Sequence, residues 1–327
     1  MGCLKGTELQ KVIISTLTLL IDNNIDVCAI SCDQGSPNRT AYKQLNVTTK
    51  NPFISILNCK IFCLFDIVHL IKSVRNNLLV TNILIGDEII SWSVLVKIFE
   101  SDNGLIRAMH KLTEAHIKPD TFQKMRAKLA TQVFSHHVAS AMLAAAATNI
   151  FEEKHKPMVI STATFFMKIN KLFDHMNSIC KYAHNPDKCA LSDENDIVEF
   201  LKESVNWISS WKKENKGVSF CFSGLTQTLN GVLGLWKHLK SEKQLYLITS
   251  HLNSDALENT ISVIRNNHGS YEKNHSAFRL HKNIKQMCFY NICTSDISSY
   301  NDSEVPVLLN MNDVEGLQLS RVCNFSN

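Results

Sequence analysis

The chain has 327 residues and a formal net charge of +4 at pH 7; 45% of its residues are hydrophobic and 20% are charged. Such a chain can bury a large core, and its length suits two domains or one domain with a large insertion. The most apolar stretch near the start, 12–21, is too short to span a bilayer, so we expect a soluble globular protein with no membrane partner.

The 11 cysteines are odd in number and scattered along the chain. Several lie inside predicted strands or helices, among them Cys28, Cys63 and Cys221. This usage indicates free, buried thiols in a reducing compartment.

Two apolar runs early in the chain each end at an aspartate. Residues 27–32 stop at Asp33, and residues 61–65 stop at Asp66, where a helical pattern begins. Such runs predict buried strands, and the following helix predicts an α/β layer with parallel strands. Because chemistry gathers at the carboxyl ends of such strands, the two carboxylates indicate a metal or phosphate site. The alternative is structural, since Asp33 begins a good turn sequence and Asp66 can cap the next helix.

Pattern changes along the chain indicate how it is organised. Residues 1 to about 82 predict helix, strand, short helix, strand and helix. From Gly86 to about Lys240 the strand signal nearly vanishes, and helical periodicity takes over with breaks near Pro119, Pro157 and Pro186. Residues 255–266 predict another helix.

These changes predict a helical block inserted between two parts of one α/β core. The expected divisions are a first core part at 1–85, a helical insertion at 86–240, a second core part at 241–295 and a poorly ordered tail at 296–327.

Charge is distributed unevenly along the chain. Residues 107–128 and 265–285 are rich in basic side chains, whereas residues 193–203 are acidic. Basic stretches can follow a phosphate backbone. The alternative is that they are solvated helix faces.

Asp255 and Glu258 stand three residues apart in a predicted helix, so both carboxylates share one helix face. That arrangement is compatible with a catalytic or metal-binding role. The same D-x-x-E pattern is also a capping box, which contributes about 1 kcal/mol to a helix and needs no metal.

Four sequence blocks stand in an order and rough spacing that resemble transposases of the P element type, a family that includes THAP-domain relatives in animals. The blocks are, in chain order, AISCDQGSPNRTAYKQLNVT, FDIVHLIKSVRNNLL, MRAKLATQVFS and ITSHLNSDALENTISVIRNNHG. They are spread over most of residues 8–285. The resemblance implies a partial ribonuclease-H-like α/β core, interrupted by a large, mostly helical insertion that binds a guanine nucleotide.

The resemblance implies cut-and-paste DNA transposition, with phosphodiester hydrolysis and strand transfer by three acids and Mg²⁺. It gives Asp33 the place of the second acid and Glu258 that of the last, both as catalytic and metal-binding residues. The family's first acid-bearing strand and its THAP DNA-binding domain would precede Met1, so we expect a truncated chain that is inactive as it stands. The alternative is a domesticated or decayed remnant that binds DNA or nucleotide without catalysis.

The resemblance also implies a GTP site in the insertion. Phe173 and Asp174 take the places of a base-reading pair, in which a carboxylate accepts two hydrogen bonds from guanine while a ring stacks on the base. The alternative for Phe173 is an ordinary core position. There is no G-x-x-x-x-G-K-[ST] loop, so GTP binding would not be of the P-loop kind.

The remaining nucleotide contacts come from the same resemblance. Lys111, Arg126, Ser135 and the backbone of Ala127 take the places of phosphate and sugar contacts, and Asp255 is placed to reach the nucleotide or its metal. Arg126 stands where lysine is usual, which keeps the charge but changes the geometry. Ser135 taken alone is typical of a helix end.

The expected partners are DNA at transposon ends and this chain itself or related transposase subunits. The expected compartment is the nucleus, or the cytoplasm if a remnant lacks an import signal.

Overall fold

The structure is a computed structural model that describes residues 4–102, 107–266, 281, 282, 284 and 285. The chain divides into two compact units, Met1–Asn253 and Ser254–Asn327. Among the described residues, no helix is long and apolar enough to cross a membrane. The tail expected at 296–327 lies outside the described residues.

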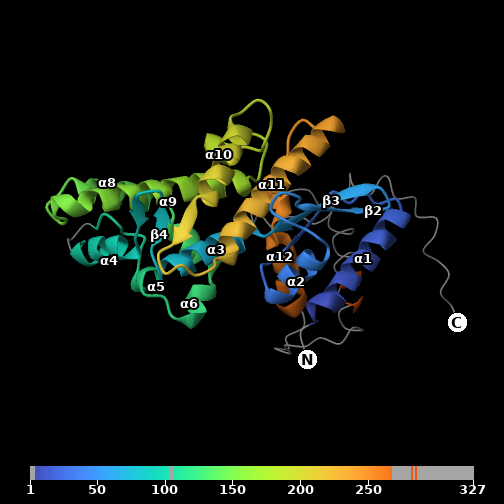
Figure 1. The fold of residues 1–327 in the computed structure, drawn as a ribbon, viewed down its shortest axis with the longest axis horizontal. Coiled ribbons are helices and arrows are strands. Elements are labelled where there is room, and N and C mark those ends of the chain that lie inside the picture. The colour runs from blue at the N-terminus through green and yellow to red at the C-terminus, as the bar shows by residue number, and fades with distance from the viewer. Residues whose placement is uncertain (1–3, 103–106, 267–280, 283, 286–327) are drawn as a thin grey trace, which may run out of the picture. The chain divides into compact units, whose positions relative to one another are not determined.

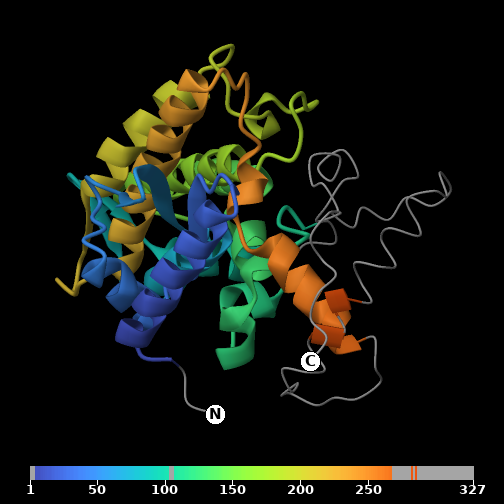
Figure 2. The same ribbon diagram turned by 90° about the vertical axis from the view of Figure 1, so that its right-hand side faces the viewer.

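The first unit begins with an α/β segment (Figure 1). Its elements are α1 (Gly6–Asp22), β1 (Ala29–Cys32), α2 (Ser36–Gln44), β2 (Phe53–Ile56), β3 (Cys59–Phe65) and α3 (Ile67–Leu78). The strands form a mixed sheet in the order β1-β3-β2, with β1 parallel and β2 antiparallel to β3. Helix α1 packs beside α2 (Figure 2). The predicted pair of parallel strands and the helix after the second strand are confirmed.

Strand β2 is not predicted from the sequence, although it forms a hairpin with β3. The two residues between these strands, Leu57 and Asn58, have φ values of 48° and 67°, as a two-residue turn that matches the strand twist requires. Such turns are recognised in a sequence by Asn-Gly or Asp-Gly, and leucine rarely adopts a positive φ. Strand β1 is only partly buried, because β3 is its single partner among the described strands.

Helices predominate in the rest of the first unit. They are α4 (Trp92–Ser101), α5 (Glu114–Ile117), α6 (Thr121–Met125), α7 (Ala127–Val133), α8 (His136–Ala146), α9 (Lys156–Met176), α10 (Ile197–Ser209) and α11 (Phe220–Ser241), with short 3₁₀ helices at Glu153–His155, Pro186–Lys188 and Thr249–Leu252. The predicted breaks are confirmed. Pro119 separates α5 from α6, Pro157 lies in the first turn of α9, and Pro186 begins a 3₁₀ helix.

A second small sheet forms where the sequence carries almost no strand signal. Strands β4 (Ile83–Ile85), β5 (Glu88–Ile90) and β6 (Trp211–Lys213) pair antiparallel in the order β5-β4-β6. Each strand has three residues, which is too short for an alternating pattern to be visible. Strand β6 also pairs with a strand far earlier in the chain, so no local signal marks it.

Helix α11 packs directly on β3 of the first sheet. A Cβ atom at Gly234 would lie 2.6 Å from Cε1 of Phe62, so glycine allows the helix to approach the sheet this closely. Farther along the interface, the Thr228 hydroxyl accepts a hydrogen bond from the Phe65 N–H at 2.9 Å and donates one to the Phe65 carbonyl at 3.1 Å. The helix therefore satisfies backbone groups at the end of β3.

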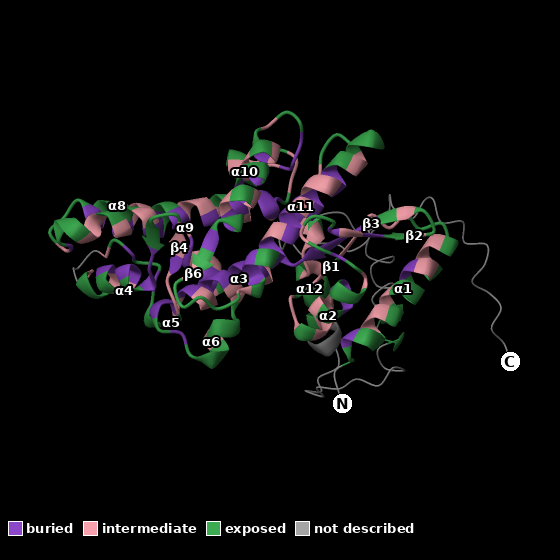
Figure 3. Cartoon of the chain, in the orientation of Figure 1, coloured by how far each residue is buried: buried purple, intermediate pink, exposed green. Residues whose placement is uncertain are grey.

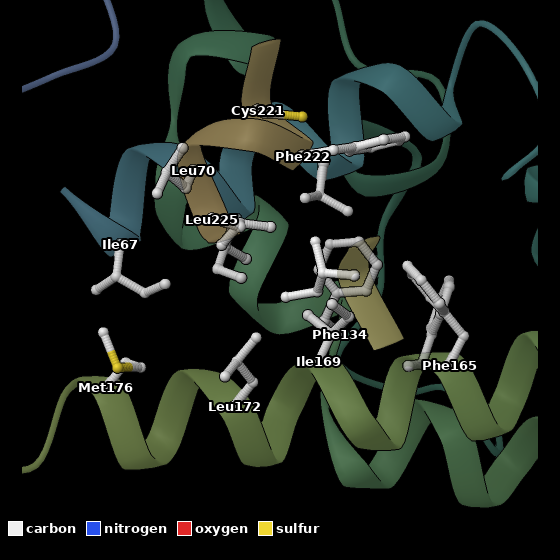
Figure 4. Close-up of a cluster of buried hydrophobic side chains, with 14 of the residues drawn as sticks. Ile67, Leu70, Phe134, Phe165, Ile169, Leu172, Met176, Cys221, Phe222 and Leu225 are labelled. Atoms are coloured by element: carbon white, nitrogen blue, oxygen red, sulfur yellow. The ribbon is translucent and has the colours of Figure 1, made fainter. Parts of the chain in front are cut away.

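One apolar core joins α3, α9 and α11 (Figure 4). Helix α9 presents a row of side chains at spacings of three and four residues, all at most 2% exposed: Phe165, Ile169, Leu172 and Met176. Opposite them lie Ile67 and Leu70 of α3 and Phe222 and Leu225 of α11. The same helices carry the purple, buried faces in Figure 3.

The second unit contains α12 (Asp255–Asn266). The helix predicted at these residues is confirmed. The predicted domain boundaries stay predictions.

The interface between Thr228 and Phe65 can be tested with Thr228→Val, which keeps the shape of the side chain and removes both hydrogen bonds. Because a buried N–H and a buried carbonyl lose a partner, we expect the free energy of unfolding to fall by about 1–3 kcal/mol in urea denaturation. Thr226→Val is the matched control, since the Thr226 hydroxyl bonds only within α11, to the Phe222 carbonyl. Equal losses in the two variants would contradict a special role for Thr228.

Candidate functional site

The parallel pairing of β1 with β3 brings two aspartates to one edge of the sheet. Cys32 is opposite Phe65, so Asp33 and Asp66 follow at equivalent positions. The Asp66 N–H also donates to the Cys32 carbonyl at 2.8 Å. The sheet edge inferred from the sequence therefore exists.

The two carboxylates at this edge differ in their surroundings. Asp66 is fully buried and caps α3, because Oδ1 accepts hydrogen bonds from the N–H groups of Val68 at 2.7 Å and His69 at 3.2 Å. This is the structural alternative considered for Asp66. Asp33 is exposed, and its Oδ1 accepts bonds from the Gly35 N–H at 2.9 Å and the Asn38 amide at 2.6 Å. Neither bond uses Oδ2.

A hollow of about 280 Å³ lies beside the turn that Asp33 begins. Its lining includes Gln34 and the cations Arg39 and Lys43 of α2. The guanidinium of Arg39 stacks on the ring of Phe220 with 3.8 Å to the ring centroid. Two cations therefore line a hollow near the turn of Asp33, which suits a phosphate-bearing ligand.

Asp255 and Glu258 lie in the first turn of α12, in the second unit, and both are exposed. The Glu258 N–H donates to the Ser254 carbonyl at 2.8 Å, and the Ser254 hydroxyl donates to Glu258 Oε1 at 3.3 Å. The helical turn therefore begins at Ser254, one residue earlier than the capping-box alternative with Asp255 as the cap requires.

Lys111 is exposed in a turn that Asp102 holds in place. The carboxylate of Asp102 accepts hydrogen bonds from the N–H groups of Ala108 at 2.9 Å and Met109 at 2.8 Å. Met109 and Leu112, on either side of Lys111, are buried. The backbone at Lys111 is therefore anchored, while its ammonium group is available to a ligand.

Ser135 caps α8, and its hydroxyl accepts a hydrogen bond from the Val138 N–H at 3.3 Å. The alternative considered for Ser135, a polar residue at a helix end, is thus present in the structure. In the same turn of α8, the ring of His137 contacts the ring of His110 edge-on, with 4.8 Å between centroids. This contact brings the turn of Lys111 to the start of α8.

Arg126 and Ala127 lie where α6 ends and α7 begins. Arg126 is exposed with an extended backbone, and Ala127 is the first residue of α7. Helix α7 is tied to α5 by a 2.9 Å hydrogen bond between His116 Nε2 and Gln132 Oε1. The segments that carry the predicted phosphate contacts are thus connected to one another.

Phe173 and Asp174 lie in the last turn of α9. The ring of Phe134, which precedes Ser135, packs on the ring of Phe166 in α9, with 4.9 Å between the ring centroids. Asp174 lies eight residues after Phe166, which is about 12 Å along the axis of α9. The predicted contact of Ser135 with phosphate or sugar and the predicted contact of Asp174 with the base therefore lie near different points along α9. Phe173 is half-buried and packs on the core, so part of the core alternative holds for it.

Asp174 has neighbours that the sequence did not single out. The Asn170 amide donates to Oδ2 at 3.1 Å, and Lys188 Nζ lies 4.0 Å from Oδ1. Asn170 stands four residues before Asp174 on one helix, so its contact follows from helical spacing. Lys188 comes from the 3₁₀ helix at Pro186–Lys188, and no sequence pattern marks its approach.

Burial dominates the electrostatics at the end of α9. It raises the pKa of Asp174 above its ordinary value, and Lys188 and Asn170 offset this only in part. The neighbouring His175 is buried, and burial lowers its pKa, so the imidazole favours its neutral form. Asp174 is therefore a carboxylate held partly out of water, which disfavours its charged form.

The described residues contain no group of three His, Cys, Asp or Glu side chains that could hold a metal ion. Their cysteines are free thiols, and Cys63 and Cys221 among them are buried. Burial raises the pKa of Cys32 and of Cys63 to about 12, so both thiols beside the acidic edge stay protonated and unreactive.

Comparison with known proteins shows what this chain resembles. Residues 68–189 match the family described as TNP-like, GTP-binding insertion domain. The transposable element P transposase of Drosophila melanogaster is 27% identical over 256 residues, which are 75% of this chain and 33% of the relative. The chain is thus similar to the P element transposase over most of its own length. It spans about a third of the length of that relative.

The solved Drosophila P element transposase strand transfer complex has the same fold. Its TM-score is 0.76 at 22% identity, over 88% of this chain and 64% of that chain. The match confirms the predicted α/β class with a large, mostly helical insertion, and a ribonuclease-H-like core agrees with it. The predicted catalytic, metal-binding and nucleotide-binding residues stay predictions.

The half-buried carboxylate of Asp174 gives a test of stability. Its folded-state pKa is raised, so its stabilising contribution is complete only at low pH and is lost as pH rises through that pKa. We expect Asp174→Asn to raise the melting temperature at pH 7 by about 2 °C, and the gain to vanish as acidification protonates the wild-type carboxyl. Thermal melts from pH 4 to 8 measure this, with the exposed Asp26→Asn as control. A lower melting temperature for Asp174→Asn at pH 7 would refute it.

Proposed function

We propose that this chain is a catalytic region of a P-element-like DNA transposase whose helical insertion binds GTP. The observation that carries the proposal is the half-buried Asp174 within residues that match a GTP-binding insertion domain. The exposed Asp33 at the carboxyl edge of two parallel strands supports the catalytic part.

The base would be read by Asp174 and Phe173. Guanine presents N1–H and N2–H₂ donors on one edge, and an ionised carboxylate accepts from both, whereas adenine presents an acceptor at N1. The Asn170 amide donates a hydrogen bond to Oδ2 of Asp174. Lys111, Arg126, Ser135 and the N–H of Ala127 would contact the triphosphate and sugar, and Asp255 would reach the nucleotide or its metal.

The phosphodiester chemistry would use Asp33 and Glu258. Both are exposed carboxylates with the hard oxygen ligands that Mg²⁺ prefers. Bound Mg²⁺ would supply charge that stabilises the attacking and leaving oxygens. The hydrogen bonds of Asp33 Oδ1 with the Gly35 N–H and the Asn38 amide also suit a structural turn, which favours a second candidate, a protein that binds DNA or nucleotide without catalysis.

The partners that follow from the proposal are DNA at transposon ends and other transposase subunits, including copies of this chain. The cations Arg39 and Lys43 beside Asp33 support a DNA partner. Because that substrate is in the nucleus, we propose a nuclear location.

Nucleotide preference tests the insertion directly. We expect calorimetry on the full chain to show GTP binding tighter than ATP by about 10- to 200-fold, because ATP leaves Asp174 without its two donors, a loss of about 1–3 kcal/mol. Asp174→Ala should remove the preference. GTP affinity should also fall on acidification, starting at a higher pH than an ordinary aspartate would give, because protonation removes an acceptor.

The control for this experiment is Asp187→Ala, since Asp187 contacts Lys171 and His175 beside the site and is not expected to touch the base. Equal affinity for the two nucleotides, or a GTP preference that persists in Asp174→Ala, would refute the base-reading role.

The acids are tested by gel assays of cleavage and joining of labelled transposon-end DNA with Mg²⁺ or Mn²⁺. We expect any metal-dependent activity to be lost in Asp33→Asn and in Glu258→Gln and kept in Asp26→Asn. Activity that survives Asp33→Asn would show that the active site lies elsewhere. A wild-type chain that binds GTP and DNA without cutting would favour the non-catalytic candidate.

A further inference from the structure

Helix α6 is held in place without a buried side chain. None of its residues is buried, and Phe122 and Met125 are 78% and 68% exposed; the helix is green in Figure 3. Its capping box, between Asp120 and Gln123, closes within the same short segment. Burial of apolar side chains therefore does little to fix the position of the end of α6 and of Arg126, the residue that follows it.

Two side chains of α3 bond the end of α6 at one atom, the carbonyl oxygen of Lys124. Arg75 Nη2 donates to it at 3.1 Å, and Asn76 Nδ2 donates to it at 3.3 Å. Arg75 Nε also donates to Asn76 Oδ1 at 2.8 Å, so the two side chains orient each other. Carbonyls in the last turn of a helix lack partners within the helix, and these two donors supply them.

Arg75 is an unusual residue to find in this position. Its side chain is fully buried, burial lowers its pKa, and no carboxylate of the described residues forms an ion pair with it. Nη1 of Arg75 has no hydrogen-bond partner among the described residues. A buried cation with so little compensation is costly, so packing stability alone does not account for it.

The two donors also lie on a well-fixed element. Helix α3 begins at the Asp66 cap, directly after β3, and buries Leu70 and Val74. It packs against α6 and α7. A group held by α3 is therefore held relative to the sheet.

We propose that Arg75 and Asn76 are positioning residues of the nucleotide site, which set Arg126 and the backbone of Ala127 through the Lys124 carbonyl. The inference rests on the proposed GTP-binding function and adds residues that touch no nucleotide themselves. Without the two donors, α6 and the Arg126 segment sample other positions. Binding of the phosphates must then order these segments, which lowers the binding affinity.

The test compares GTP and ATP binding to the full chain by calorimetry for wild type, Asn76→Ala, Arg75→Lys and Asn77→Ala. We expect Asn76→Ala to bind GTP about tenfold more weakly and to keep the preference for GTP, because Asp174 is untouched. Arg75→Lys keeps the charge and loses the planar fork, so it should weaken binding in the same way. Asn77→Ala is the matched control, since the Asn77 amide contacts the Ser73 carbonyl and Cys221 Sγ, and its Oδ1 accepts from the Ser219 hydroxyl, all away from α6.

Hydrogen exchange separates positioning from mere stability. In wild type and Asn77→Ala, GTP should slow exchange of the amides at 126–129, and in Asn76→Ala this protection should be largely lost. Unchanged GTP affinity and protection in Asn76→Ala and Arg75→Lys would overturn the positioning role alone. A wild-type chain that binds no GTP would instead overturn the proposed function, and the inference with it.

Discussion

The apolar contact of α9 with α3 and α11 is the constraint on which the first unit depends. Phe165, Ile169, Leu172 and Met176 form one face of α9, and burying each stabilises the fold by about 1.5–3 kcal/mol. Because the row spans three turns, α9 is fixed in both position and rotation. Helix α11 in turn lies close to β3, where Gly234 admits the Phe62 ring. The helical part and the first sheet are thus packed through shared helices.

A fixed α9 determines what its last turn can do. Asp174 is on the helix that the core locks, so its carboxylate stays half-buried even though burial raises its pKa. Lys188 and Asn170 reduce that cost without removing it. A carboxylate held at a cost is suited to a ligand with two donors, because binding replaces the hydration that folding removed. Stability and nucleotide preference are therefore expected to oppose each other at this position.

Helix α3 connects the acidic sheet edge to the segment predicted to hold phosphates. It begins at Asp66, beside the position of Asp33, and about 15 Å farther along it presents Asn76 to the Lys124 carbonyl. The connection is rigid because α3 is buried along most of one face. If GTP orders the segment around Arg126, this ordering acts on α3, because Asn76 of α3 bonds the Lys124 carbonyl beside that segment. The same helix begins at the acidic edge. Under the proposed function, this helix would link nucleotide binding to the acidic edge.

The sequence by itself determined the elements with strong local patterns: the parallel strands before Asp33 and Asp66, the proline breaks and the helix that contains Glu258. Long apolar runs and helical periodicity are local properties, so they are visible without the fold. It also indicated the acidic edge, and the resemblance implied a base-reading role for Asp174, which stays a prediction. Only the tertiary structure decided the rest. The hairpin of β2, the pairing of β6 with β4, and the approach of Lys188 and Arg75 to their partners join segments distant in the chain or use turns without a sequence signal, and such contacts form only when the whole core packs.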